Sequence, residues 1–420
     1  MEHTVHAPWI TAPATRAVID ALTADGADVR FVGGCVRDAL LGRESADIDI
    51  GTPDPPERVL ALLENAGIET RTVPRGIEHG TVTALAGGER YEITTLRRDE
   101  RTDGRHAEVA FTDDWREDAA RRDITINAMS AAPDGTLYDY FGGQEDLKAG
   151  RVRFVGDPAT RIAEDHLRIL RFFRFDAWYG RGEPDDDALA ACKDAARTIP
   201  SLSGERVQAE MLKLLAAPDP VPAIETMREI GVLAELMPEV QGTEYLARLV
   251  AIENNHAEAD PVRRLTSLML DTYYGASDFA ALSVLVNRWR LSGDDGARLA
   301  ALTDLPAALN DDLDARDLRA LLYRLGSDRV RDLILMTWAV QDKAGSETTR
   351  RAMMETARAW QAPAFPLTGS DVLAQGVDAG PKVGQLLKTV EDWWIERDFA
   401  PDRTALLERL DALVAESRLG

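Results

Sequence analysis

The sequence predicts an α+β protein with an N-terminal α/β head, built on a small mixed sheet, and an all-helical remainder. Within residues 1–150, short apolar strands alternate with amphipathic helices. Beyond about residue 155 the periodicity is helical almost throughout, and convincing strand patterns nearly vanish. With 420 residues, of which 45% are hydrophobic, the chain is long enough to form several domains with cores of their own.

The head begins with a strand, a helix and a second strand, which are followed by another helix and a hairpin. Gly33-Gly34 ends the first strand, and Gly42 and Gly67 end the two helices. Polar and apolar residues alternate on both sides of Gly87-Gly88, which predicts the hairpin. The predicted strands are 29–32, 48–50, 81–85 and 91–95, and the predicted helices are 35–41 and 57–66.

The helical remainder is predicted from apolar residues that recur at the spacing of one helix face. Loop-like stretches at 184–187, 218–222 and 363–366 are candidate boundaries. The predicted helices are 159–179, 203–216, 221–235, 262–272, 279–290, 314–325, 328–341, 348–360 and 402–417. The predicted segments are a head (1–150), a helical neck (151–217), a helical body (218–345) and a helical tail (346–420).

The charge of the chain excludes nucleic-acid binding by a uniformly basic surface. The chain holds 49 Lys and Arg residues against 72 Asp and Glu residues, a formal net charge of −23. Any nucleic acid would therefore have to be bound by local basic patches. The two cysteines, Cys35 and Cys192, do not make a disulfide framework, and no apolar run reaches the length of a membrane span. We therefore expect a cytoplasmic protein.

Two glycines, an arginine and two aspartates cluster after the first strand. Gly33 and Gly34 close a strand and open a helix, so a phosphate can approach their backbone closely. Arg37, one helical turn further on, can add a charge-assisted fork to the same phosphate. Asp47 and Asp49 lie two residues apart on the predicted second strand, so their carboxylates leave the same face. The cluster predicts a site for phosphate chemistry.

The paired carboxylates suit Mg²⁺, which binds through one or two carboxylates together with the phosphates of a substrate. Two such ions, about 3.5–4 Å apart, can clamp the attacking and leaving oxygens of an in-line phosphoryl transfer. Asp47 and Asp49 are the predicted ligands, and Glu92 on the hairpin strand is a candidate third ligand. A D-x-D pattern alone is more often a solvated strand face, but the glycines, the arginine and the aspartates together favour a functional site.

This arrangement resembles a known signature. Gly33-Gly34-x-x-Arg37-Asp38, Leu41-Gly42 and Asp47-x-Asp49 are similar to the signature motif of the tRNA nucleotidyltransferase and bacterial poly(A) polymerase family. That family belongs to the polymerase-β-like nucleotidyltransferase superfamily, and its bacterial form is often called class II. The resemblance implies that the head is the catalytic nucleotidyltransferase domain.

Two further motifs follow in the order that the family predicts. Residues 121–128 resemble its R-R-D-F-T-I-N-A motif, with Ile124 in place of the usual aromatic residue. Within that motif Arg122 is expected to hold the triphosphate of the substrate. Residues 139–147 resemble the third motif, with Tyr140 in place of the usual proline. The glycines of this motif suggest a hinge or turn between the head and the helical region.

An arginine-rich segment lies at residues 151–175, where six arginines stand against three acids. Asp165 and Arg168 fall on a slanting stripe of the predicted helix, because three residues fall short of one turn. Arg171 and Arg174 continue that stripe. Spacing alone favours an intrahelical ion pair, worth about 0.3–0.5 kcal/mol.

The resemblance instead favours base recognition by this segment. Glu164-Asp165-x-x-Arg168 is similar to the E-D-x-x-R motif with which the family selects CTP and ATP without a nucleic-acid template. Asp165 accepts hydrogen bonds and Arg168 donates them, so the pair can read the edge of a base. Arg171 and Arg174 match further arginines that contact the nucleotide.

Residues 97–106 are polar, contain a glycine and lack helical periodicity, which predicts a loop. They resemble the flexible loop of the family, often D-G-R-H-P, with Ala107 in place of the proline. Family members that add only the two cytidines are expected to lack this loop. Its presence therefore argues against a CC-only activity.

Taken together, the motifs imply a CCA-adding tRNA nucleotidyltransferase that uses Mg²⁺. Such an enzyme adds CMP, CMP and AMP from CTP and ATP to the 3′ end of tRNA and releases pyrophosphate. An A-adding enzyme stays open as an alternative. A poly(A) polymerase also stays open, although residues 391–420 hold eight acids and four arginines where a basic tail would be expected. A catalytically inactive RNA-binding relative would need a broken D-x-D or E-D-x-x-R motif, and both are intact.

Overall fold

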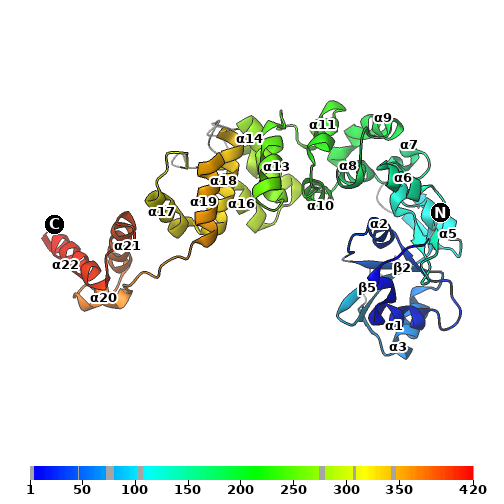
Figure 1. Ribbon diagram of the computed structural model, residues 1–420, viewed down its shortest axis with the longest axis horizontal. Coiled ribbons are helices and arrows are strands. Elements are labelled where there is room, and N and C mark those ends of the chain that lie inside the picture. Colours follow the sequence, from blue (N-terminus) through cyan, green and yellow to red (C-terminus); the bar gives the residue numbers. More distant parts are fainter. Residues whose placement is uncertain are drawn as a thin grey trace. The chain divides into compact units, whose positions relative to one another are not determined.

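The computed structural model describes residues 4–45, 47–71, 80–102, 107–273, 280–305, 309–341 and 347–419. The chain forms two compact units, Met1–Thr243 with Ala280–Ser292, and Glu244–Phe279 with Gly293–Gly420 (Figure 1). Helix α15 (Ala280–Trp289) therefore belongs to the first unit, although the chain on both sides of it belongs to the second. The finer division into head, neck, body and tail stays a prediction.

The head is built on a seven-stranded sheet with the strand order β3-β4-β5-β2-β1-β8-β9. Strands β2 and β5 run parallel, and the other described neighbours in this sheet run antiparallel. The predicted small mixed sheet and the predicted hairpin, β4–β5, are thus confirmed. The strands are β1 (Arg30–Val32), β2 (Ile48–Thr52), β3 (Glu69–Arg71), β4 (Thr81–Ala86), β5 (Glu89–Thr95), β8 (Ser130–Ala131) and β9 (Leu137–Tyr138).

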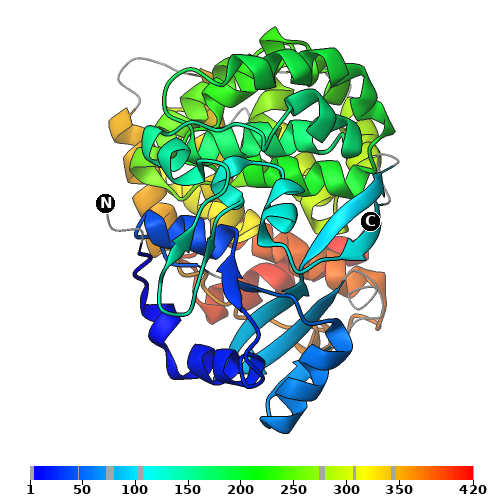
Figure 2. The same cartoon turned by 90° about the vertical axis from the view of Figure 1, so that its right-hand side faces the viewer.

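Helices complete the first unit, and in Figure 2 those of the first 65 residues are blue and those between about residues 186 and 236 are green. Helices α1 and α3 contact each other and strand β4 and so support the sheet. The helices are α1 (Pro13–Leu22), α2 (Gly34–Leu40), α3 (Pro56–Asn65), α5 (Trp115–Ala120), α6 (Gly143–Ala149), α7 (Pro158–Glu164), α8 (Arg168–Tyr179), α9 (Asp186–Ala195), α10 (Gly204–Leu215), α11 (Val221–Glu229) and α12 (Val232–Leu236), with α15.

The prediction of a loop at 97–106 is wrong for residues 97–102, which form a strand. Strand β6 (Arg97–Thr102) pairs antiparallel with β7 (Ala107–Phe111) in a separate two-stranded sheet, which we call the ribbon. Residues 103–106 lie outside the described residues. Strand pairing depends on backbone hydrogen bonds and does not require apolar side chains. Residues 97–102 are polar and show no alternation of apolar residues, so their sequence did not indicate a strand.

Two of the predicted helices are interrupted. The helix predicted at 159–179 is divided into α7 and α8, because Asp165 between them is extended, with φ −154° and ψ 106°. The helix predicted at 221–235 is divided into α11 and α12 at Gly231, whose φ of +86° a helix cannot accommodate. The stretch at 184–187 is not a plain loop, because Asp185 caps α9 by accepting a hydrogen bond from the backbone of Ala188.

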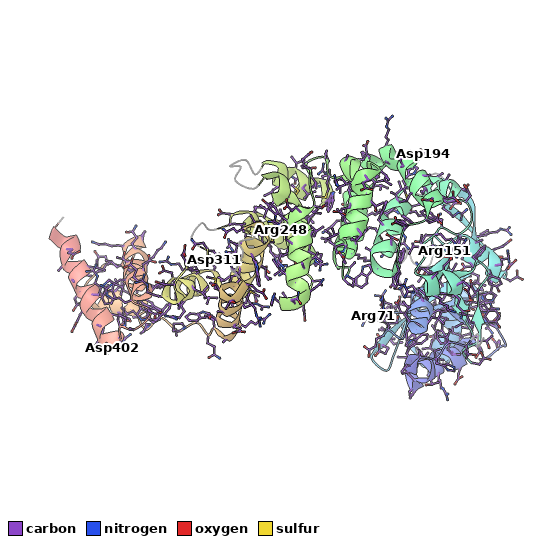
Figure 3. All side chains as sticks on the ribbon, turned by 45° about the horizontal axis from the view of Figure 1, so that its top comes forward. Arg71, Arg151, Asp194, Arg248, Asp311 and Asp402 are labelled. Atoms are coloured by element: carbon purple, nitrogen blue, oxygen red, sulfur yellow. The ribbon has the colours of Figure 1, made fainter. Side chains whose placement is uncertain are left out.

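The second unit is helical throughout its described residues and has two hydrophobic cores. One core surrounds α18, and the other is made largely by the last three helices. In Figure 3, Asp311 marks the approach to α17, where its carboxylate accepts a 2.6 Å hydrogen bond from the buried Arg350. The helices are α13 (Glu244–His256), α14 (Pro261–Tyr273), α16 (Gly293–Thr303), α17 (Ala315–Leu325), α18 (Ser327–Gln341), α19 (Glu347–Ala359), α20 (Gly369–Ala374), α21 (Pro381–Glu396) and α22 (Arg403–Leu419).

The other predicted helices match the observed ones to within a few residues. The helices that were not predicted from the sequence are α1, α5, α6, α9, α13, α16, α20 and α21. Among the described residues, none of the helices combines the length and the apolar content that a membrane crossing requires.

Candidate active site

A cavity of about 580 Å³ opens in the first unit, and nearly every predicted site residue lines it. Its walls carry eight arginines and four carboxylates, so the cavity is basic although the chain has a net charge of −23. An acidic protein can therefore attract a triphosphate here. Asp47 is the one predicted site residue that does not line it. The predicted residues that do are Gly33, Gly34, Arg37, Asp49, Glu92, Arg122, Asp165, Arg168, Arg171 and Arg174.

Asp49 and Glu92 lie side by side at this cavity on neighbouring strands. Asp49 on β2 and Glu92 on β5 are register partners in the parallel pair, so their side chains leave the same face of the sheet. Burial and the charge of Glu92 raise the pKa of Asp49 to about 6, and Arg122 opposes this shift. A cation bound between the two carboxylates would relieve their repulsion.

Asp47 is exposed and precedes β2, which begins at Ile48, so the prediction that it lies on the strand is wrong. The charge of Asp47 nevertheless contributes to the raised pKa of Asp49. The described part of the chain contains no cluster of three or more His, Cys, Asp and Glu side chains that could hold a metal ion. The role of Asp47 as a metal ligand stays a prediction.

The turn between β1 and α2 brings Gly33 against an arginine. Gly33 has a φ of +74°, and a Cβ atom there would lie 2.8 Å from Nη1 of Arg122. That same Nη1 donates a 3.3 Å hydrogen bond to the carbonyl of Asn127. Because Gly33 has no side chain, the guanidinium of Arg122 can lie against the turn between β1 and α2.

Gly33→Ala is therefore expected to displace Arg122 as well as strain the backbone, at a cost of about 1–3 kcal/mol for the strain alone. We expect the KM for nucleoside triphosphates to rise about tenfold, because the predicted contact of Arg122 with the triphosphate would be lost. Gly42→Ala is the matched control, because Gly42 also has a positive φ, +65°, but has nothing within 4 Å of a Cβ atom. Steady-state kinetics of both variants check this, and an unchanged KM in Gly33→Ala would contradict it.

Arg37 is held in place by its neighbours. Its guanidinium donates to the carboxylate of Asp38 at 3.0 and 2.8 Å and to Oδ1 of Asn127 at 2.5 Å. The ring of Tyr179, on α8, stacks against the guanidinium with its centroid 4.2 Å from Cζ, and its hydroxyl donates to Asp38 at 3.1 Å. Arg37 keeps two N–H groups beyond these three bonds. Its predicted contact with a phosphate therefore depends on those two.

The break between α7 and α8 places Asp165 in the cavity wall. Its Oδ1 accepts from the backbone N–H of Leu167 at 3.1 Å, and its carbonyl accepts from the N–H of Arg168 at 2.9 Å. Its Oδ2 forms a 2.6 Å ion pair with Arg206 of α10. Asp165 and Arg168 are thus neighbours at the start of α8, but Asp165 is not part of a continuous helical stripe.

The three arginines of α8 are each held by carboxylates. Arg168 pairs with Glu164 and also donates to the backbone carbonyls of residues 161 and 121, each at 2.9 Å. Arg171 pairs with Asp123 at 2.6 Å. Arg174 approaches Glu210 to 3.0 Å. These pairs orient the guanidiniums toward the cavity, which all three arginines line.

Comparison with known proteins decides the family of this site. The family described as "Poly A polymerase head domain" matches residues 29–153, and that described as "Probable RNA and SrmB- binding site of polymerase A" matches residues 183–242. The CCA tRNA nucleotidyltransferase 1, mitochondrial, of Danio rerio is 33% identical over 405 residues, which cover 91% of this chain and 87% of that protein. This chain belongs to the CCA tRNA nucleotidyltransferase family.

Bacterial members of the CCA tRNA nucleotidyltransferase family are similar as well. The CCA-adding enzyme of Levilactobacillus brevis is 32% identical over 401 residues, covering 93% of this chain and 96% of that protein. The crystal structure of the Bacillus stearothermophilus CCA-adding enzyme in complex with CTP aligns with a TM-score of 0.74 and 26% identity, covering 98% of this chain and 99% of that one. The predicted nucleotidyltransferase fold is thereby confirmed.

Two residues that form ion pairs with predicted site residues were not predicted from the sequence. Arg206 and Glu210 lie four residues apart on α10, and so on one face of that helix. They pair with Asp165 and with Arg171 and Arg174, respectively. Their i,i+4 spacing was the only feature of the local sequence that could have indicated a shared role. The same spacing is typical of a surface ion pair, so it did not indicate a site.

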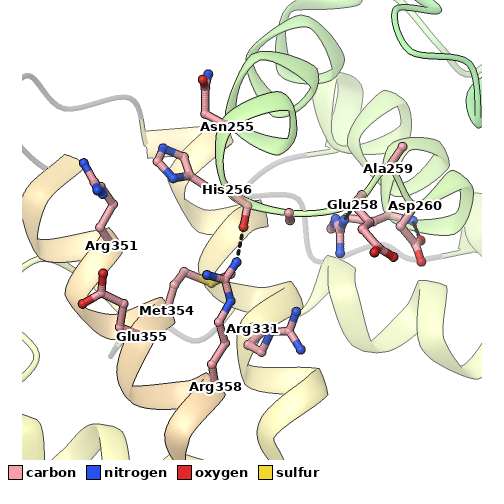
Figure 4. A pocket seen from close by; sticks show the side chains of 12 residues that line it. Asn255, His256, Glu258, Ala259, Asp260, Arg331, Arg351, Met354, Glu355 and Arg358 are labelled. Atoms are coloured by element: carbon pink, nitrogen blue, oxygen red, sulfur yellow. Dashed lines mark hydrogen bonds between the residues drawn. The ribbon is translucent and has the colours of Figure 1, made fainter.

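Figure 4 shows a second cavity, of about 720 Å³, in the second unit. Arg358 donates to the carbonyl of His256, whose ring stacks on Trp338 with the centroids 5.0 Å apart. Arg351 and Glu355 of α19 both line it, so opposite charges are mixed there. None of the predicted site residues lies in this cavity, and we assign it no role in the nucleotidyltransferase reaction.

Proposed function

We propose that this chain is a CCA-adding enzyme, which transfers CMP, CMP and AMP in turn from CTP and ATP to the 3′ end of tRNA. One observation carries the proposal. A single basic cavity brings the paired carboxylates Asp49 and Glu92 together with the arginines of α8. The carboxylates suit phosphoryl transfer, and the arginines with Asp165 suit the recognition of a base without a template.

Each transfer is an in-line displacement at the α-phosphorus. The 3′-hydroxyl oxygen of the RNA bonds to the α-phosphorus, the bond from that phosphorus to the bridging oxygen breaks, and pyrophosphate leaves. The hydroxyl proton passes to solvent. We propose Asp47, Asp49 and Glu92 as the catalytic carboxylates. Asp47 and Asp49 would hold Mg²⁺, and Glu92 is a candidate third ligand. When bound, the ion supplies Lewis-acid polarisation of the hydroxyl and the phosphate.

The nucleotide would be bound in two parts. The triphosphate is proposed to bind at the turn after β1, to Gly33, Gly34, Arg37 and Arg122. The absence of a side chain at Gly33 leaves room there for the guanidinium of Arg122. Asp165 and Arg168 are proposed to read the base, because both line the cavity at the start of α8.

Arg171 and Arg174 are proposed to support this pair. Each is oriented by a carboxylate, Arg171 by Asp123 and Arg174 by Glu210. Their charge would also stabilise the bound nucleotide, since guanidiniums form strong hydrogen bonds with phosphate and base acceptors.

The helical segments beyond the cavity are proposed to bind tRNA by its shape and backbone. The body (218–345) and the tail (346–420) would take this role. We place the protein in the cytoplasm, where thiols stay reduced, because Cys35 and Cys192 are both buried and unpaired.

The test is extension of tRNA transcripts that end before CCA, after C and after CC. Each transcript is offered CTP, ATP or both with Mg²⁺, and an unstructured RNA serves as the control substrate. We expect all three transcripts to be completed to CCA and extension then to stop. Long A-tails on the unstructured RNA would indicate a poly(A) polymerase, and extension of the CC-ended transcript alone would indicate an A-adding enzyme.

A further inference from the structure

A buried carboxylate lies behind the arginines of the cavity wall. Asp118 belongs to α5, its side chain is only 5% exposed, and it does not line the cavity. Its Oδ1 accepts from the guanidinium of Arg121 at 2.9 and 2.8 Å and from the backbone N–H of Arg97 at 3.3 Å. Its Oδ2 accepts from Nη2 of Arg122 at 3.3 Å. One carboxylate therefore bonds three residues that all line the cavity.

The same bonds attach the ribbon to that wall. Arg97 is the first residue of β6. Its backbone N–H donates to Asp118, and its backbone carbonyl accepts from Nε of Arg121 at 3.1 Å. The start of the ribbon is thus held on both sides by the Asp118–Arg121 pair.

The charge of Asp118 is maintained by its partners. Burial raises the pKa of this carboxyl. The positive charges of Arg122 and Arg121 lower the pKa by more than burial raises it, so the net pKa lies below the usual value. Arg122 donates to Asp118 and to the carbonyl of Asn127, each at 3.3 Å, which is long for a hydrogen bond. Arg122 and Asp118 also form an ion pair, so their opposite charges add to these two bonds.

We propose that Asp118 is a positioning residue for nucleotide binding, which aims Arg122 at the triphosphate and joins it to the start of the ribbon. The inference rests on the proposed function, in which Arg122 binds the triphosphate. Asp118 bonds neither Asp165 nor Arg168, and its partner Arg121 contacts Arg168 only through a backbone carbonyl, which accepts from Nη2 of Arg168 at 2.9 Å. We therefore expect Asp118 to act mainly on the binding of CTP and ATP alike, and much less on the choice between them.

The test uses Asp118→Asn in the full chain, with steady-state kinetics for CTP and ATP and inhibition by inorganic tripolyphosphate. Asparagine keeps the shape but removes the charge. We expect KM for both nucleotides, and Ki for tripolyphosphate, to rise by the same factor of about ten, the effect of one charge-assisted hydrogen bond. The kcat and the CTP-to-ATP preference should change by less than about threefold, because binding and not base reading is altered.

Asp146→Asn is the matched control. Asp146 is fully buried and accepts from Nε of Arg151 at 2.7 Å and of Arg153 at 2.6 Å, but it lies outside the cavity lining. Its loss should lower the melting temperature and leave KM and Ki unchanged. If the two variants instead shift KM and Ki equally, the role of Asp118 is only structural and the inference is wrong.

Asp118→Glu covers the case in which the asparagine variant does not fold. Glutamate keeps the charge but moves the carboxylate by one bond length, so we expect KM and Ki to rise about threefold at a near-normal melting temperature. Unchanged KM and Ki in that variant would overturn the inference. Failure of the wild-type protein to extend any tRNA, with tripolyphosphate still bound more weakly by Asp118→Asn, would instead refute the proposed function alone.

Discussion

Asp49→Asn is expected to abolish nucleotide transfer and, at the same time, to stabilise the fold at neutral pH. The folded protein raises the pKa of Asp49 from 3.8 to about 6, first through burial and then through Glu92. The folded state therefore holds this proton more tightly than the unfolded chain. Stability from this group is present below pH 3.8 and is lost as the pH rises to about 6. Above that pH the ionised carboxylate costs about 3 kcal/mol, which the neutral amide removes.

The measurement is a pair of experiments on one preparation. At pH 7.5 and with Mg²⁺, tRNA extension should fall by about 10³-fold or more, since a lost metal ligand removes several kcal/mol of transition-state stabilisation. Without Mg²⁺, the melting temperature should rise by about 2 °C or more. Retained turnover at normal Mg²⁺ would overturn the assignment of Asp49 as a catalytic carboxylate.

Asp47→Asn tests whether Asp47 has the same role as Asp49. Asp47 is exposed, so its replacement should not raise the melting temperature. If Asp47 is a metal ligand, the variant loses extension activity, and if it only contributes charge near Asp49, activity falls only slightly. The wild-type protein supplies a further check, because without Mg²⁺ its melting temperature should fall as the pH increases through about 6 and Asp49 ionises.

Asp165→Asn is expected to weaken the choice of CTP and ATP over UTP and GTP. Cytosine and adenine present an amino donor where uracil and guanine present a carbonyl acceptor. The carboxylate of Asp165 only accepts, whereas an asparagine amide can also donate. Competition between the four nucleotides in single-nucleotide extension should show the preference reduced about tenfold or more, the discrimination value of one base contact.

Asp157→Asn is the control for this variant. Asp157 caps α7 by accepting from the backbone N–H of Thr160 at 2.7 Å, and Asp165 similarly accepts from the backbone N–H of Leu167 at 3.1 Å, but Asp157 does not line the cavity. The amide oxygen of asparagine can accept the same backbone hydrogen bond at either position, so both variants should fold. Loss of preference in Asp157→Asn, or full preference in Asp165→Asn, would show that Asp165 does not read the base.

Much of the head could be predicted because its signals are local. The strand before Gly33, the alternation around Gly87-Gly88 and the order of the motifs all lie within short stretches of sequence. Strands β1, β2, β4 and β5 are observed where these patterns predict them. The cluster from Gly33 to Asp49 was predicted from the chemistry of its residues, Glu92 from its place on the hairpin strand, and the later arginines with Asp165 from motif resemblance. The cavity contains all of these site residues except Asp47.

The errors occurred where contacts with another segment decide the conformation. The helix predicted at 159–179 breaks at Asp165, whose side chain accepts from the backbone N–H of Leu167 and pairs with Arg206 forty-one residues away. The predicted loop at 97–106 begins as a strand, because Ala107–Phe111 pairs with it. Neither partner is visible in the periodicity of the segment itself.

The sequence by itself therefore determined the family, the places of β1, α2, β2, α3, β4 and β5 in the head, and the residue types of the site. Only the tertiary structure decided how those residues meet. Asp49 and Glu92 became neighbours through the parallel pairing of β2 and β5. The proposed role of Asp118 follows from the hydrogen bonds that three residues, Arg97, Arg121 and Arg122, donate to its buried carboxylate. Local periodicity reports which face of an element is apolar, but the pairing of elements depends on contacts across the fold.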